Sequence, residues 1–124
     1  MSRVIAGIGF RRDCAAEDLL AVIAAAAARA GRAVDALAVP EFKAEDAARE
    51  AARRLAVPLI LVPRTALQEA QGRCQTRSAA AARATGFASV AEGCALAAAG
   101  DGGRLVLARI TGERATCALA EDVS

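Results

Sequence analysis

Apolar runs and charged, helix-forming stretches take turns along the first half of the chain. The apolar runs 3–10, 34–39 and 59–62 predict buried strands. The segments between them, 15–30 and 44–56, predict helices, and the second carries its charges as a solvated helix face would. Because parallel strands are joined by helical crossovers, this order predicts a parallel sheet with helices on both faces.

Three helices are predicted in succession in the second half of the chain. The first covers residues 65–70, the second covers 79–84, and the third starts after Ser89 and runs through Ala99. Glu92 stands three residues after Ser89, so the pair fits a capping box, in which each side chain accepts a hydrogen bond from the other residue's backbone N–H. On this interpretation both residues serve only to start the helix.

Two further apolar runs predict a hairpin at the C-terminal end. Residues 105–110 and 115–119 flank the turn 111–113, and they are expected to add an antiparallel edge to the sheet. The fold class is therefore α/β: a single-domain, αβα layered fold with a mainly parallel sheet of about five strands. The domain is expected to cover residues 1–120, with 121–124 as a frayed tail.

Composition excludes several classes of function. The chain has 124 residues, a net charge of +2, no Trp or Tyr and only three Phe. So small a charge and so few aromatic rings argue against nucleic acid as a partner. No apolar run approaches the roughly 20 residues of a membrane span, and no signal-peptide pattern follows Arg3. We therefore expect a cytoplasmic protein with no membrane partner.

The reactive residue types are few. Histidine is absent, which excludes histidine-based triads and disfavours a transition-metal site, so neither a metal nor a cofactor is predicted. The four cysteines form no C-x-x-C pair and are expected to be reduced packing residues: Cys14, Cys74, Cys94 and Cys117. Cys14 lies near a helix start, a position that favours a lowered thiol pKa. Any catalysis must use carboxylates, Lys43, a cysteine or backbone groups.

The turn between the first strand and the first helix is the strongest candidate for a binding site. Gly7 and Gly9 precede Arg11 and Arg12, and glycines let a ligand approach the backbone closely. The start of the following helix attracts anions, and arginine forks bind carboxylates in pairs. Two glycines at this spacing are equally what close packing of a strand against a helix requires, so both interpretations stay open.

The loop after the second strand adds a second cation. In parallel sheets ligands bind beyond the carboxyl ends of the strands, so the loops after Phe10, Val39 and Val62 should share one rim. Lys43, in the second of these loops, is the only lysine beside fifteen arginines. It is either a cation for a ligand carboxylate or carbonyl, or an exposed surface residue. The dinucleotide fingerprint and the Walker phosphate loop are both absent.

Three sequence blocks together resemble one known family. In chain order they are Gly7-Ile8-Gly9-x-Arg11-Arg12, Lys43-Ala44-Glu45-Asp46 and Thr85-Gly86-x-x-Ser89-Val90-Ala91-Glu92. Over nearly its whole length the chain is similar to the CobE and CbiG C-terminal domain family of cobalamin biosynthesis, in its stand-alone CobE form. The resemblance implies a precorrin or corrinoid ligand, a tetrapyrrole with carboxylates on its rim, and other enzymes of the pathway as further partners.

The resemblance also implies a set of ligand-binding residues: Gly7, Gly9, Arg11, Arg12, Lys43, Ser89 and Glu92. The leading interpretation is a carrier or accessory to ring-modifying enzymes. Because the CbiG family opens a lactone on a cobalt-containing intermediate, a hydrolase is the alternative, with Glu92 or Asp46 activating water and Lys43 or Arg11 stabilising the oxyanion. A regulatory domain for another organic anion is the third. The sequence leaves open which corrinoid binds, whether a reaction occurs and what the oligomeric state is.

Overall fold

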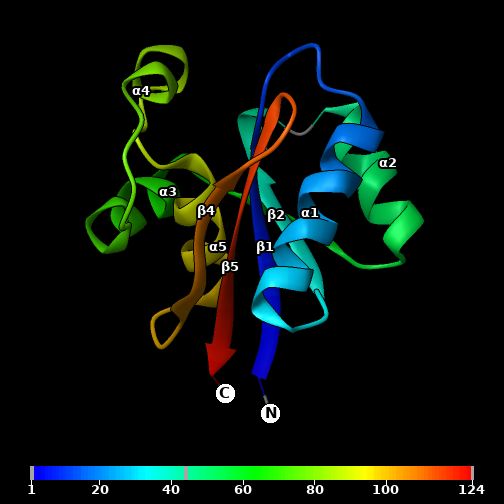
Figure 1. Ribbon diagram of the computed structural model, residues 1–124. Helices are drawn as coiled ribbons and strands as arrows, with labels where there is room; N and C mark the ends of the chain where they lie inside the picture. Colours follow the sequence, from blue (N-terminus) through cyan, green and yellow to red (C-terminus); the bar gives the residue numbers. More distant parts are fainter. Residues whose placement is uncertain (1, 44, 124) are drawn as a thin grey trace.

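The computed structural model describes residues 2–43 and 45–123 and shows a five-stranded sheet with helices on both faces (Figure 1). The strands are β1 (Ser2–Phe10), β2 (Ala36–Pro40), β3 (Leu59–Val62), β4 (Arg104–Thr111) and β5 (Ala115–Val123). Their order across the sheet is β3-β2-β1-β5-β4. Strands β1, β2 and β3 are parallel, whereas β5 is antiparallel to both of its neighbours. The predicted α/β fold with a C-terminal antiparallel hairpin is confirmed.

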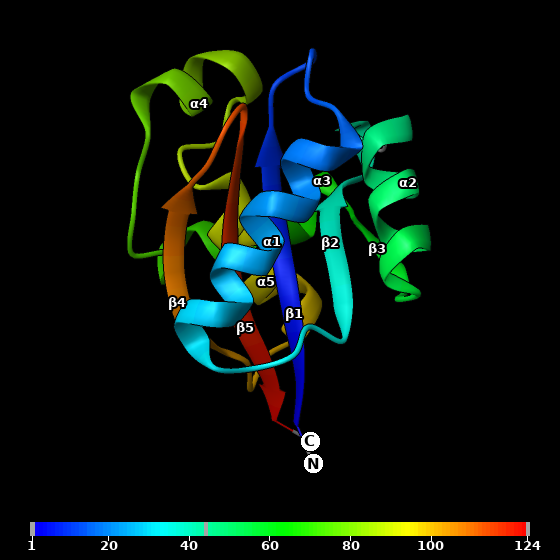
Figure 2. The same ribbon diagram turned by 45° about the vertical axis from the view of Figure 1, so that its right-hand side comes forward.

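The helices divide between the two faces of the sheet (Figures 1 and 2). They are α1 (Ala16–Ala30), α2 (Asp46–Leu55), α3 (Arg64–Ala70), α4 (Ala79–Thr85) and α5 (Val90–Ala99), with short 3-10 turns η1 (Glu41–Lys43) and η2 (Gln71–Arg73). Helices α1 and α2 pack on one face around Leu19 and Leu119, and α3 and α5 pack on the other around Leu67 and Leu96. The predicted helices are all present, with ends that agree with the prediction or differ from it by at most two residues; residue 44 lies outside the described residues.

Gly7 allows α5 to pack closely on the centre of the sheet. A Cβ atom at Gly7 would overlap the carbonyl oxygen of Ala91 and approach the backbone nitrogen of Ala95 to 2.5 Å. Since interiors are packed without room for such an overlap, only glycine fits here. The sequence left two interpretations open for the glycines, close packing of a strand against a helix and approach of a ligand to the backbone. Gly7 serves the first of these.

The last strand is longer than the sequence predicted. β5 continues through Val123, where it pairs with Ser2 of β1, so residues 121–123 belong to the sheet and Ser124 lies outside the described residues. Glu121 is buried within this extension and accepts hydrogen bonds from Arg104 Nε (2.6 Å) and Arg32 Nη1 (3.3 Å). These two arginines satisfy its carboxylate, which is why a charged residue can continue a buried strand instead of fraying.

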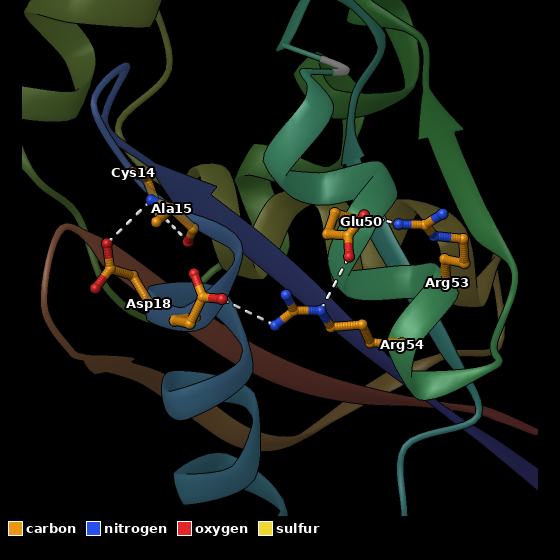
Figure 3. A network of polar contacts seen from close by, with 7 residues as sticks. Cys14, Ala15, Asp18, Glu50, Arg53 and Arg54 are labelled. Atoms are coloured by element: carbon orange, nitrogen blue, oxygen red, sulfur yellow. Dashed lines mark hydrogen bonds and ion pairs between the residues drawn. The ribbon is translucent and has the colours of Figure 1, made fainter.

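An ion-pair network fixes the start of α1 against α2 (Figure 3). Arg54 of α2 donates to Glu17 of α1 (3.0 Å) and to Glu50 one turn earlier in its own helix (2.9 Å). At the first turn of α1, Asp18 accepts from the N–H of Ala15 (3.0 Å), which satisfies one of the orphan donors of a helix start. The charged face predicted for α2 is therefore partly engaged in contacts between helices.

Across residues 2–43 and 45–123, no helix combines the length and the apolar character needed to cross a bilayer.

Candidate functional site

A cavity of about 700 Å³ opens at the edge of the sheet where β1 and β2 end. Its walls come from the loop after β1, the segment after β2, helix α4 and the turn of the β4–β5 hairpin. In Figures 1 and 2 the hairpin turn lies between α4 and the loop after β1. The predicted rim thus forms from the first two loops, whereas the loop after Val62 contributes no lining residue among those described.

Five cationic side chains among the described residues line this cavity: Arg11, Arg12, Lys43, Arg109 and Arg114. Glu45 is the acidic residue that the same part of the chain contributes to the lining. A concave surface lined mainly by charges of one sign concentrates the electric field and attracts ligands of the opposite charge. The cavity is therefore suited to an anion with several negative groups.

Lys43 is held in place by the end of β1. Its Nζ donates to the carbonyl oxygen of Phe10 (2.6 Å) and lies 5.2 Å from the centroid of the Phe10 ring. Both contacts orient the ammonium group, the second by a cation–π interaction. The single lysine therefore joins the second loop to the first, as a rim cation rather than a freely exposed surface residue.

Gly9 forms part of the cavity wall where β1 ends. A Cβ atom there would come within 2.8 Å of Thr116 Oγ1, and that hydroxyl donates to the Gly9 carbonyl oxygen (3.3 Å). Unlike Gly7, which is covered by α5, Gly9 lines the cavity. The two glycines of the motif consequently differ in role, since one permits packing and the other leaves backbone accessible at the site.

The β4–β5 hairpin brings two arginines that the sequence analysis did not assign to the site, Arg109 of β4 and Arg114 of the turn. Arg114 adopts a left-handed backbone conformation with φ 59°. Its carbonyl oxygen accepts from the N–H of Arg11 (2.9 Å), and its Nε donates to Asp13 (3.2 Å). Arg11 and Arg114 meet because Phe10 pairs with Ala115. The sequence could have predicted this contact only if it had shown that β5 lies beside β1.

Glu92 is a buried structural carboxylate, and the predicted capping box is wrong. Its Oε1 accepts from the N–H groups of Gln75 (2.6 Å) and Thr76 (2.9 Å), and its Oε2 accepts from Thr76 Oγ1 and from the N–H of Arg109, both at 2.9 Å. The side chain is fully buried. Burial alone would raise the pKa of Glu92, but these donors, led by Arg109 N–H, outweigh it and lower the pKa.

Four of the residues predicted for the site come together at the cavity, and the others do not. The four that line it are Gly9, Arg11, Arg12 and Lys43. Ser89 is buried and donates from Oγ to the carbonyl oxygen of Thr76. Asp46 is exposed at the start of α2 and borders a separate small hollow that it shares with Arg12. Ser89 and Asp46 do not line the cavity, and neither do Gly7 and Glu92.

Cys14 is not an activated thiol. Burial and, to a lesser extent, the negative charges of Asp18 and Asp13 together raise the pKa of its thiol to about 11, against a smaller opposing effect of Arg114. The lowered pKa expected from its place near a helix start is therefore wrong, because the thiol is partly buried and these carboxylates lie beside the same turn. Within residues 2–43 and 45–123, no three His, Cys, Asp or Glu side chains gather closely enough to hold one metal ion.

The fold and the cavity define a class of small single-domain α/β proteins, with a cavity lined mainly by cations at the carboxyl edge of the parallel strands. Comparison with known proteins gives the particular family. The family described as "Cobalamin synthesis G C-terminus" matches residues 4–120, and the chain belongs to it. No curated protein matches the chain. The resemblance to CobE and to the C-terminal domain of CbiG is confirmed.

Solved structures agree with this assignment. The chain is similar to CobE, a protein from the cobalamin (vitamin B12) biosynthetic pathway, with 37% identity and a TM-score of 0.89, covering 97% of this chain and 90% of that one. It is similar to the cobalamin biosynthesis protein chiG from Agrobacterium tumefaciens, with 34% identity, a TM-score of 0.75 and coverages of 94% and 96%. The protein accordingly takes part in cobalamin biosynthesis.

A third structure shares the fold alone. It is a putative cobalamin biosynthesis protein G homologue from Sulfolobus solfataricus, with 22% identity and a TM-score of 0.76. The match covers 98% of this chain and 37% of that one. The same fold therefore also occurs as one part of a longer polypeptide.

Proposed function

We propose that the cavity binds a carboxylate-rich precorrin or corrinoid intermediate and that the protein is a cytoplasmic carrier of, or accessory for, the enzymes that modify the corrin ring. The observation that carries the proposal is the set of five cations on one cavity, contributed by the loop after β1, by Lys43 of η1 and by the hairpin. Intermediates of cobalamin biosynthesis carry several acetate and propionate groups on the ring rim, and these are matched by separately placed cations.

The number of cations is what makes useful affinity attainable. An exposed ion pair contributes only about 0.2 to 1 kcal/mol, so one arginine alone would hold a carboxylate weakly. Several pairs formed by one polycarboxylate act together, because the entropy of association is lost only once. A cavity of about 700 Å³ also lies within the range of about 300 to 1,000 Å³ that small-molecule sites occupy.

The hydrolase alternative receives less support from the geometry. Both oxygens of Glu92 are occupied by donors from Gln75, Thr76 and Arg109, and the side chain is fully buried. A general base must reach the proton that it removes, directly or through one water. Glu92 has no such access to the cavity, and Asp46 lies outside the cavity lining, so neither candidate base faces a bound lactone.

The test is a titration with hydrogenobyrinic acid followed by absorbance. We expect saturable binding that weakens in Arg11→Ala and Lys43→Ala, with the ligand spectrum unchanged in shape. Arg29→Ala is the matched control, since Arg29 is an exposed arginine near the end of α1 and does not line the cavity. A spectrum that changes with time would favour an enzyme over a carrier. Citrate binding as tightly would favour a regulatory anion site, and absence of binding would refute the proposal.

A further inference from the structure

The three aromatic residues of this chain all gather at the cavity. Phe10 and Phe42 line it, and Phe87 stacks against Phe42 with ring centroids 6.1 Å apart and planes inclined by 23°. The chain has no Trp or Tyr and only these three Phe. Phe10 and Phe87 are also buried in the cores on the two faces of the sheet, so Phe42 is the one of the three that exposes ring surface.

Phe42 is held firmly although its ring is partly open to solvent. Behind it Phe87 is buried, and the Arg64 guanidinium carbon lies 4.3 Å from the Phe42 centroid and 5.4 Å from the Phe87 centroid. Cation–π contacts of this length are favourable and fix the orientation of the ring. The Phe42 ring is therefore ordered before any ligand arrives, which reduces the entropy lost on binding.

Packing within the protein does not explain why the Phe42 side chain is exposed. Three large apolar residues among those described are more than a third exposed, namely Phe42 (38%), Leu55 (39%) and Leu61 (40%). Of these, only Phe42 lines the cavity. Ligand sites combine apolar surface with a few placed polar groups, and Phe42 supplies such surface one residue before Lys43.

We infer that Phe42, supported by Phe87 and Arg64, is the platform on which the apolar body of a tetrapyrrole ring packs while the rim carboxylates meet the cations. This inference rests on the proposed function and adds the origin of its specificity. Arginines alone bind any polycarboxylate, whereas a ring platform favours a macrocycle over an open-chain acid. Phe42 is thus the residue that distinguishes the two.

The first test compares two ligands on two variants. The exposed part of Phe42 is about 75 Å² of apolar surface, and covering most of it corresponds to about a tenfold change in Kd. We expect Phe42→Ala to raise the Kd for hydrogenobyrinic acid about tenfold and to leave the Ki of citrate, measured by displacement, unchanged. Arg11→Ala should raise both constants. Leu61→Ala, which truncates an equally exposed side chain away from the cavity, should change neither.

The second test needs no substitution in the measured protein. Because the chain has three Phe and no Tyr, Trp or His, its aromatic proton NMR region holds three ring systems, and the Phe42 signals are assigned by their loss in Phe42→Leu. A tetrapyrrole shifts the protons of a ring that packs against it. We expect hydrogenobyrinic acid, and not citrate, to move the Phe42 signals.

The outcomes separate the two proposals. Wild-type protein that binds hydrogenobyrinic acid, with unmoved Phe42 signals and an unchanged Kd in Phe42→Ala, would overturn the platform and leave the proposed function standing. An equal loss of citrate affinity in Phe42→Ala would also overturn it. Wild-type protein that does not bind hydrogenobyrinic acid would overturn the proposed function and the platform together.

Discussion

Glu92 connects three parts of the chain, and Glu92→Gln should destabilise the protein although it preserves side-chain size. In the wild type, Oε1 accepts from the N–H groups of Gln75 and Thr76, while Oε2 accepts from the Thr76 hydroxyl and the Arg109 N–H. The glutamine oxygen can keep the first two donors. The Thr76 hydroxyl can turn to accept, but the Arg109 N–H then faces an amide NH₂ group that cannot accept its hydrogen.

The magnitude follows from these four contacts. A buried donor without a partner costs about 1 to 3 kcal/mol, and the remaining bonds also lose their charge-assisted strength. We therefore expect Glu92→Gln to lower the free energy of unfolding by about 2 to 4 kcal/mol, measured by urea denaturation at pH 7. A loss below about 0.5 kcal/mol, which is typical of surface substitutions, would refute this account of Glu92.

The pH dependence gives an independent check on the same residue. The pKa of Glu92 in the folded protein is lowered by its donors, so the unfolded chain takes up this proton at a higher pH than the folded one. The contribution of Glu92 is thus fully present above the unfolded pKa and is lost as pH falls through the folded pKa. The difference in stability between wild type and Glu92→Gln should accordingly narrow in acid; a difference that widens there would contradict the assignment.

Two further substitutions or labelling tests address other parts of the fold. Gly7→Ala should destabilise the protein by about 1 to 3 kcal/mol or more, because the added Cβ would overlap Ala91 and press on Ala95. Gly72→Ala is the control, since its Cβ would meet no atom within 4 Å. Equal melting temperatures for the two variants would contradict this packing. Cys14, with its thiol pKa raised to about 11, should react with iodoacetamide at pH 8 more slowly than a free thiol. Rapid labelling of wild type that is absent in Cys14→Ala would refute that environment.

The order of strands and helices was predictable because each strand is a short apolar run that is bordered by glycine, proline or charged residues. Two short segments show the limit of this reasoning. Glu121 looks like the start of a frayed end until Arg32 and Arg104 are known to meet it. Ser89 and Glu92 fit a local capping pattern, yet Glu92 is satisfied by donors 16 and 17 positions away in sequence. The spacing of residues along the sequence does not show whether a side chain will bond to a neighbouring residue or to one far away in the chain.

The candidate site was half predictable for the same reason. Gly9, Arg11, Arg12 and Lys43 lie in loops that any parallel sheet places at its carboxyl edge, so their positions follow from the order of strands. The contribution of the hairpin does not follow from that order, because it depends on which strand pairs with β1. Sequence alone also could not separate the glycine that lines the cavity from the one under α5, since both occupy the same short motif.

The pairing of β5 with β1 is what completes the site. Because β5 is antiparallel to β1, its first residue, Ala115, lies opposite Phe10, the last residue of β1. A strand that ran parallel to β1 in the position of β5 would begin at the opposite edge of the sheet, near Ser2. The chain would then need a helical crossover between β4 and that strand. The hairpin therefore delivers Arg109 and Arg114 to the edge where Arg11 already lies. Lengthening the hairpin turn should consequently weaken ligand binding while the sheet stays intact, since the cations on its two sides would separate.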